Sequence, residues 1–99
     1  MKKSAIGSVG KQNKFILFVS GMSPHSINAI RNIGKICDKY MPGDYELEII
    51  DIIKQKQQAA AYQIIALPTL IRLEPEPKRI ILGDLSNTSK VLKILNINP

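Results

Sequence analysis

The chain has 99 residues, 44% of them hydrophobic, so one compact domain is expected. No apolar stretch is long enough to cross a bilayer, and the basic opening segment lacks the continuous apolar core of a secretory signal, so no membrane association and a cytoplasmic location are expected. The single cysteine, Cys37, excludes an internal disulfide, which fits a reducing compartment.

The formal net charge of +6 is concentrated near the N-terminus. Four of the fourteen basic residues lie in the first fourteen positions, where there is no acid, and the remainder has ten basic against eight acidic residues. Residues 1–13 are therefore predicted to form a flexible basic arm, and residues 14–99 a single domain. No aromatic stacking surface or arginine-rich stripe accompanies the charge, so nucleic acid is not an expected partner.

The first predicted strand is the continuously apolar run at 15–19, which suits a strand covered on both faces. Gly21 ends this strand. Ser23 then offers an N-cap, and Pro24 a first-turn residue, for a helix that ends at Pro42-Gly43. The apolar face of this helix consists of residues spaced three or four apart: Ile27, Ile30, Ile33 and Cys37.

In the second predicted strand, at 45–49, apolar and acidic residues alternate. Tyr45, Leu47 and Ile49 fall on one face, and Glu46 and Glu48 fall on the other. The preceding helix is long enough to cross a small sheet. Because a strand, a helix and another strand form a right-handed βαβ unit, these two strands are expected to be parallel.

The second half of the chain is predicted to hold a helix, a hairpin and a last helix. Its segments are a Gln- and Ala-rich helix at 54–65, strands at 67–73 and 79–82 around a turn at 74–77, a cap at Ser86, and a final helix over 91–97. The order βαβαββα is that of a thioredoxin-like α/β fold, which has three layers and a mixed four-stranded sheet. In that fold a proline before the third strand normally has a cis peptide bond, and by analogy of layout Pro68 occupies this place.

The turn S-G-M-S-P-H-S at 20–26 lies where a thiol-redox protein presents a Cys-x-x-Cys pair, but both positions are serine. A hydroxyl is too weakly acidic to supply the attacking thiolate, so no catalytic residue is predicted. Ser23 is instead the expected N-cap, and Ser26 a first-turn residue that bonds to the local backbone. Cys37 is expected in the core and His25 in solvent, so neither a metal nor a cofactor is expected.

Four segments carry a family resemblance. They are G-M-S-P-H-S at 21–26 (close to a G-x-T-P-x-S pattern), I-D-I at 50–52, A-L-P-T-L at 66–70 and R-I-I-L-G-D-L-S-N at 79–87. With these segments, residues 14–92 resemble the KaiB family of small clock proteins that work with the KaiC ATPase. The last two are distinctive in combination, since G-D-L-S-N after a strand is not a general thioredoxin feature.

The resemblance implies a non-enzymatic regulatory binding protein that docks onto a KaiC-like ATPase and autokinase, in circadian timing or in stress adaptation. Further implied partners are a KaiA-like regulator or a sensor histidine kinase, and the resting protein would be a homo-oligomer, either a dimer or a tetramer. Two alternatives stay open: a thioredoxin- or glutathione-type redox protein, and a receiver-docking module that acts in trans in a two-component pathway.

Candidate site residues follow from the same resemblance and from the available charges. The expected partner-binding positions are Asn28, Glu48, Lys54, Lys56, Gln63, Arg72 and Arg79. Several of these positions are often basic in clock proteins, so a separate, matched ATPase is expected. The expected structural positions are Gly21, Ser23, Pro24, Ser26, Pro68, Gly83 and Asp84.

The C-terminal segment is where the resemblance implies a choice between two folds. KaiB-like proteins adopt a thioredoxin-like fold and a resting fold, βαββααβ, whose last segment is a strand. Here the apolar spacing around Val91 favours a helix, and the family's usual glycine near Ile94 and acid near Asn96 are both replaced. Loss of a helix-interior glycine favours the helix by up to about 1 kcal/mol, so a bias toward the thioredoxin-like fold is predicted. The alternative is that the surrounding structure overrides this propensity and the resting fold dominates.

Overall fold

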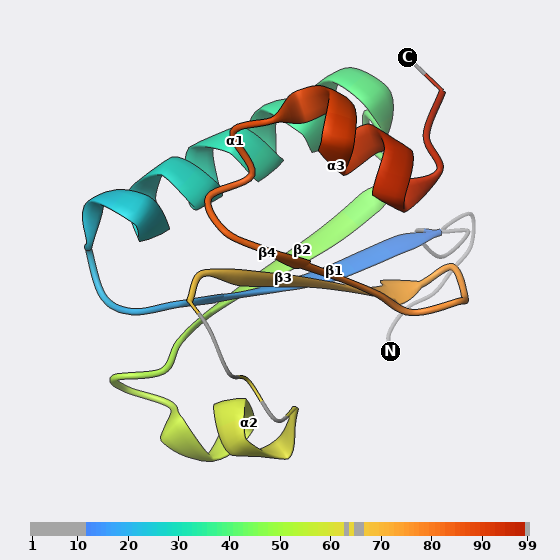
Figure 1. The fold of residues 1–99 in the computed structure, drawn as a ribbon. Coiled ribbons are helices and arrows are strands. Elements are labelled where there is room, and N and C mark those ends of the chain that lie inside the picture. The colour runs from blue at the N-terminus through green and yellow to red at the C-terminus, as the bar shows by residue number, and fades with distance from the viewer. Residues whose placement is uncertain (1–11, 63, 65–66, 99) are drawn as a thin grey trace.

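The computed structural model describes residues 12–62, 64 and 67–98, and its elements follow the predicted order βαβαββα (Figure 1). They are β1 (Asn13–Val19), α1 (Pro24–Tyr40), β2 (Tyr45–Asp51), α2 (Lys56–Ala61), β3 (Thr69–Glu74), β4 (Arg79–Leu82) and α3 (Thr88–Leu95). In the part of the chain that is described, no helix is long and apolar enough to span a bilayer.

The strands form one mixed sheet in the order β2-β1-β3-β4. β1 and β2 are parallel, with Phe15 opposite Leu47, whereas β3 runs antiparallel to both β1 and β4. The predicted parallel pair and the predicted hairpin are therefore confirmed. The sheet is sandwiched between α1 and α3 on one face and α2 on the other (Figure 1), and β2 and β4 are its two edges.

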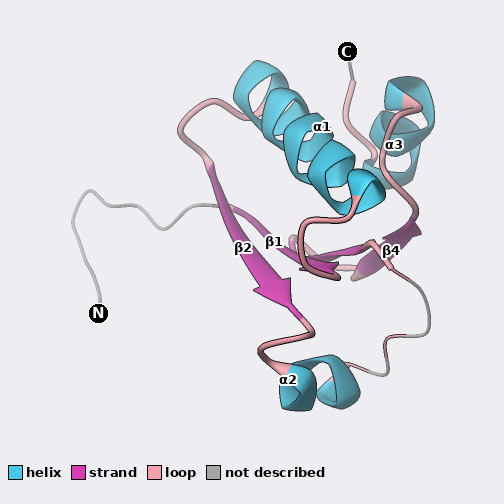
Figure 2. Cartoon of the chain, turned by 90° about the vertical axis from the view of Figure 1, so that its left-hand side faces the viewer, coloured by secondary structure: helices cyan, strands magenta, loops and turns pink. Residues whose placement is uncertain are grey.

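The two faces of the sheet are buried unequally. The face under α1 and α3 carries a large cluster that includes Leu17, Ile33, Leu70 and Leu92. On the α2 face, the buried cluster consists of Ile16, Phe18, Ile50 and Ile71. Alternation along β1 supplies both clusters, and residues 15–19 are all buried, as predicted. Because α2 is short and lies under one end of the sheet (Figure 2), the α2 face is less completely covered than the face under α1 and α3.

The second helix is much shorter than the predicted helix at 54–65. The chain first makes a turn at Asp51, whose carbonyl oxygen accepts hydrogen bonds from the N–H groups of Lys54 at 3.0 Å and Gln55 at 2.9 Å. These bonds delay the helix until Lys56, and it ends at Ala61. The predicted last residue, Ile65, lies outside the described residues. The turn also ends β2 at Asp51, although the Ile52 N–H still donates to the Val19 carbonyl oxygen of β1 at 3.0 Å.

The ends of two other elements also differ from the predictions. Asn87, not Ser86, is the N-cap of α3, because its side-chain oxygen reaches the Lys90 N–H at 3.1 Å. β1 begins at Asn13, one residue before the predicted start of the domain, and residues 1–11 of the predicted arm lie outside the described residues. The buried face of α1 includes the predicted Ile33 and Cys37, whereas the predicted Ile27 and Ile30 are half-buried. The other buried residues of the helix are Ser26, Ala29 and Ile36.

Candidate binding surface

The serine pair occupies the turn between β1 and α1, where it is part of the helix cap. Ser23 is the N-cap, and its hydroxyl accepts from the Ser26 N–H at 3.3 Å and donates to Ser26 Oγ at 2.8 Å. Ser26 Oγ also accepts from the Ser20 N–H at 3.1 Å, and Ser26 is buried. Both hydroxyls therefore act as structural groups that close the turn onto the end of β1.

The same turn is tied to the end of β2. Gly21 has a left-handed φ of +59°, and its N–H donates to Asp51 Oδ1 at 3.0 Å. A Cβ at Gly21 would lie 3.2 Å from Ile53 Cδ1, so the backbone conformation and the space both suit glycine. Pro68, preceded by a cis peptide bond, comes directly before Thr69, which pairs with Phe18 of β1. Its position at the end of β1 is the one expected from the fold.

The segment 83–87 joins β4 to α3 and contacts α1. Gly83 has a left-handed φ of +100°, and the Asp84 carbonyl oxygen accepts from Asn32 Nδ2 at 2.9 Å. The Asp84 carboxylate accepts from the Ser86 N–H at 3.1 Å and lies 3.8 Å from His25 Nδ1. Hydrogen bonds from Ser86, and secondarily the nearby His25, hold the pKa of Asp84 below the usual aspartate value. The segment therefore links the two helices that cover the same face of the sheet.

His25 and Cys37 are the residues with possible ligand or redox chemistry. The His25 side chain is largely exposed, as expected, but it has an acid neighbour that lies far away in the sequence. Within the described ranges, no three His, Cys, Asp or Glu side chains are placed to hold a metal ion. Cys37 is fully buried, and burial together with the neighbouring Asp38 raises the pKa of its thiol to about 12. A thiolate at this position is therefore strongly disfavoured at neutral pH.

The predicted partner-binding residues are spread over both edges of the sheet. Glu48 is exposed on β2, and Lys54 and Lys56 are exposed just beyond it, before and at the start of α2. Arg79 is exposed on β4, at the opposite edge, and Asn28 is half-buried on α1. Gln63 lies outside the described residues. Glu48, Lys54 and Lys56 are thus close in the chain at one edge, and Arg79 cannot join them in one patch.

Arg72 is not a surface residue, and its prediction as a partner-binding position is corrected. The residue is 6% exposed, and its guanidinium donates to the carbonyl oxygen of Leu95 at 2.6 Å and to that of Pro77 at 3.0 Å. Burial, and then the charge of Arg79, lower the pKa of Arg72 below the usual arginine value. These two hydrogen bonds hold the Arg72 side chain inside the domain and connect the end of α3 to the hairpin turn.

Two apolar residues on β4 were missed by the sequence analysis. Ile80 and Leu82 are each 55% exposed, whereas Ile81 between them is buried against the α1 and α3 face. The alternation of side chains along a strand could have predicted this exposure. If Ile81 faces the main core, both of its neighbours must point to the α2 face of the sheet. The edge strand β4 therefore presents an apolar surface to solvent.

Comparison with known protein families gives a match to one family and to several named relatives. A family model described as the KaiB domain matches residues 16–97. The chain is 45% identical over 83 residues to circadian clock protein KaiB3 of a Synechocystis species, an alignment that covers 84% of this chain and 81% of that protein. It is 43% identical over 76 residues to circadian clock oscillator protein KaiB of Thermostichus vulcanus, covering 77% and 70%.

Comparison with solved structures supports the fold. The N-terminal domain of Synechococcus elongatus SasA has a TM-score of 0.70 at 19% identity, covering 97% of this chain and 91% of that one. Fasciola hepatica thioredoxin has a TM-score of 0.70 at 14% identity, covering 93% and 86%. At these identities the likeness concerns the fold alone, and the predicted thioredoxin-like fold is confirmed.

Proposed function

The chain belongs to the KaiB family, and on that premise we propose that it is a non-enzymatic regulatory binding protein of a Kai-type system. It docks onto a KaiC-like ATPase and autokinase and modulates the phosphorylation or the output of that enzyme. The relatives named as circadian clock proteins support the regulatory role. The output is either circadian timing or stress adaptation.

The hydrogen-bonded serine pair carries the non-enzymatic part of this proposal. In a thioredoxin-like fold, disulfide exchange needs a thiolate at the turn between β1 and α1 and a second sulfur to resolve the intermediate. Here that turn holds Ser23 and Ser26, bonded to each other at 2.8 Å. Cys37 lies elsewhere, in the core, with a thiol pKa raised to about 12. The scaffold is therefore proposed to act through its surface.

The proposed docking surface consists of Glu48, Lys54 and Lys56, with the exposed Ile53 between them in the chain. An apolar side chain flanked by charges of both signs suits a specific protein interface, because the apolar contact adds affinity and the charges select the partner. The proposal also includes a KaiA-like regulator or a sensor histidine kinase as further partners, and a dimer or tetramer as the resting state.

Native mass spectrometry of the full chain with the KaiC-type ATPase encoded in the same genome tests this function. We expect a complex in the presence of ATP or of ADP. The double variant Lys54→Glu, Lys56→Glu should weaken it strongly, whereas Lys35→Glu, an exposed charge reversal on α1, should not. Absence of a complex in every nucleotide state would contradict the docking proposal. Reduction of insulin disulfides above background by the purified chain would contradict the non-enzymatic one.

A further inference from the structure

β4 is an edge strand, and among the described residues nothing pairs with its outer side. The Gly83 N–H donates to the Pro68 carbonyl oxygen at 3.0 Å, so the main-chain N–H of Gly83 points toward β3 and not outward. In an antiparallel pair, residues that bond to the neighbouring strand alternate with residues that do not. The main-chain groups of Ile81 therefore also face β3, whereas the N–H and C=O groups of Ile80 and Leu82 point outward and can accept a further strand.

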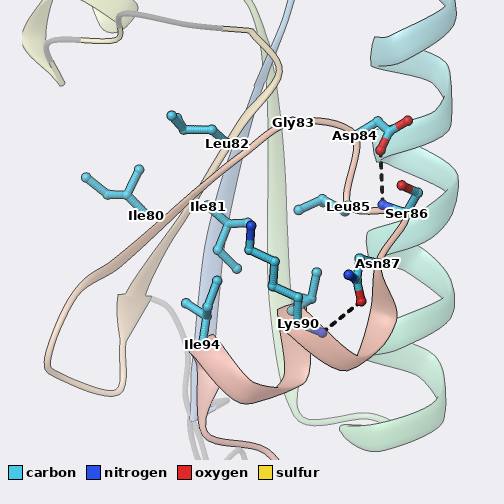
Figure 3. A pocket seen from close by; sticks show the side chains of 11 residues that line it. Ile80, Ile81, Leu82, Gly83, Asp84, Leu85, Ser86, Asn87, Lys90 and Ile94 are labelled. Atoms are coloured by element: carbon cyan, nitrogen blue, oxygen red, sulfur yellow. Dashed lines mark hydrogen bonds between the residues drawn. The ribbon is translucent and has the colours of Figure 1, made fainter.

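The side chains beside this free edge differ between the two faces of the sheet. On the α2 face stand Ile80 and Leu82, each more than half exposed. On the α3 face, a hollow of about 360 Å³ lies between β4 and α3, with Ile81 and Ile94 in its lining. Figure 3 shows Lys90 extending from α3 across this hollow toward β4, and Ile80 and Leu82 pointing away from it. Beside β4, the α2 face of the sheet is therefore apolar, and the α3 face carries the positive charge of Lys90.

The charge on the α3 side is not neutralised within the described residues. Lys90 and Arg79 are both exposed, and neither forms an ion pair there. Asp84 also lines the hollow, but its carboxylate bonds to the Ser86 N–H and lies beside His25 (Figure 3). An acidic side chain brought next to β4 on this face would meet unpaired positive charge.

We propose that β4 binds an extended segment of a partner protein as an additional strand, and that this segment alternates apolar and acidic side chains. Main-chain hydrogen bonds to Ile80 and Leu82 would provide the affinity of strand addition. Alternation then sends the apolar side chains of the segment toward Ile80 and Leu82, and its acidic side chains toward Lys90 and Arg79.

A second copy of this chain fits the edge less well than such a segment. Antiparallel pairing of β4 with its own symmetry mate would place Arg79 and Lys90 of both copies on the same face of the joined sheet, where the four positive charges repel one another. The chain's own alternating strand, β2, already packs Tyr45 and Leu47 against the main core. The edge also lies across the sheet from the surface proposed for the ATPase, so each proposal can fail without the other.

Amide NMR of the full chain with synthetic peptides tests the proposal. The probe is a blocked peptide of alternating glutamate and valine. Its two controls carry lysine in place of glutamate, or N-methyl groups on alternate backbone nitrogens. We expect saturable shifts at Ile80, Leu82 and Lys90, with slower hydrogen exchange at the Ile80 and Leu82 amides. The lysine peptide should bind at least about fivefold more weakly, and the N-methylated peptide should not protect these amides.

A matched pair of charge reversals on α3 locates the interaction. Lys90 lines the hollow, whereas Lys93, which is also exposed on the same helix, does not. Lys90→Glu should weaken binding of the glutamate peptide at least about fivefold and strengthen binding of the lysine peptide, while Lys93→Glu should change either by less than about twofold. The amide spectrum of each variant checks that its fold is intact.

Four outcomes would overturn the proposal. The first is the absence of saturable shifts along β4. The second is equal binding of the glutamate and lysine peptides, and the third is equal protection by the N-methylated peptide, which would exclude strand addition. In the fourth, the Ile80 and Leu82 amides shift with protein concentration in the absence of peptide, and a second copy is the occupant of the edge.

Discussion

Replacement of Arg72 by methionine should destabilise the domain, although it removes a buried charge that has no acidic partner in the described part of the chain. The Arg72 guanidinium donates to the carbonyl oxygens of Leu95 and Pro77, and thus fastens α3 to the β3–β4 turn. Methionine retains an unbranched apolar stem in place of that of arginine and fills irregular space well, so the substitution tests the hydrogen bonds more than the packing of the stem.

The expected loss follows from two opposing contributions. A hydrogen bond to a charged group contributes about 1.5–3 kcal/mol, so the two bonds contribute about 3–6 kcal/mol together. Leu95 is also the last residue of α3, where a cation contributes up to about 2 kcal/mol with the helix dipole. The desolvation of the guanidinium opposes these contributions, and it lowers the pKa of Arg72. The Arg72 Nε also has no hydrogen-bond partner among the described residues. We expect a net loss of about 2–3 kcal/mol, which is about 10 °C or more in Tm for a domain of this size.

Urea unfolding monitored by far-ultraviolet circular dichroism measures this loss, and amide hydrogen exchange locates it. Exchange should accelerate first in α3, because the Leu95 carbonyl oxygen loses its donor. Arg79→Met is the matched control: Arg79 lies opposite Arg72 in the sheet but is exposed, so its replacement should change stability by no more than about 0.5 kcal/mol. An Arg72→Met variant as stable as the parent would refute the reasoning, since desolvation would then outweigh both hydrogen bonds.

Three further predictions concern a thiol, a carboxylate and a helix. With its pKa raised to about 12 by burial, Cys37 should react with Ellman's reagent at pH 8 only after denaturation, and rapid labelling of the native protein would contradict its core position. Asp84→Asn should lower the free energy of unfolding at about pH 7, because a carboxylate with a lowered pKa contributes stability above its unfolded pKa. The urea midpoints of the two proteins should converge as the pH falls through the lowered pKa of Asp84. Ile94→Gly should destabilise α3 by about 1 kcal/mol more than Ile94→Ala, which removes the same packing, and equal losses by NMR-monitored unfolding would show that backbone propensity does not matter there.

Short-range patterns in the sequence predicted the framework of the fold well. The apolar run at 15–19 is a strand buried on both faces, and Ser23 with Pro24 begins α1 as the capping rules require. These features depend on residues within one or two turns of each other. The predicted N-cap of α3 was wrong by one residue, because Ser86 and Asn87 are both good caps and the sequence does not show which side chain reaches the first turn.

Long-range contacts could not be predicted in the same way. Arg72 was expected on the surface, but its partner carbonyl at Leu95 is 23 residues away in the sequence, and no local pattern indicates that the two meet. Similarly, His25 and Asp84 become neighbours only when α1 and α3 cover the same face of the sheet. The exposure of Ile80 and Leu82 depends on the short length of α2, which leaves part of the opposite face open.

The unequal burial of the two sheet faces makes α3 the element on which the fold bias predicted from the sequence depends. The larger core cluster includes Val91, Leu92 and Leu95 of α3, so the thioredoxin-like packing is lost if this segment leaves the helix. Asn96 closes the helix in the left-handed conformation, which asparagine tolerates better than most residues, and its N–H bonds to the Leu92 and Lys93 carbonyl oxygens. The isoleucine that replaces glycine at position 94 favours the helix by up to about 1 kcal/mol, and the Arg72 hydrogen bonds contribute about 2–3 kcal/mol net. In proteins that switch folds, two packings of one sequence differ by only a few kcal/mol, so contributions of this size would be large enough to bias this chain toward the thioredoxin-like fold.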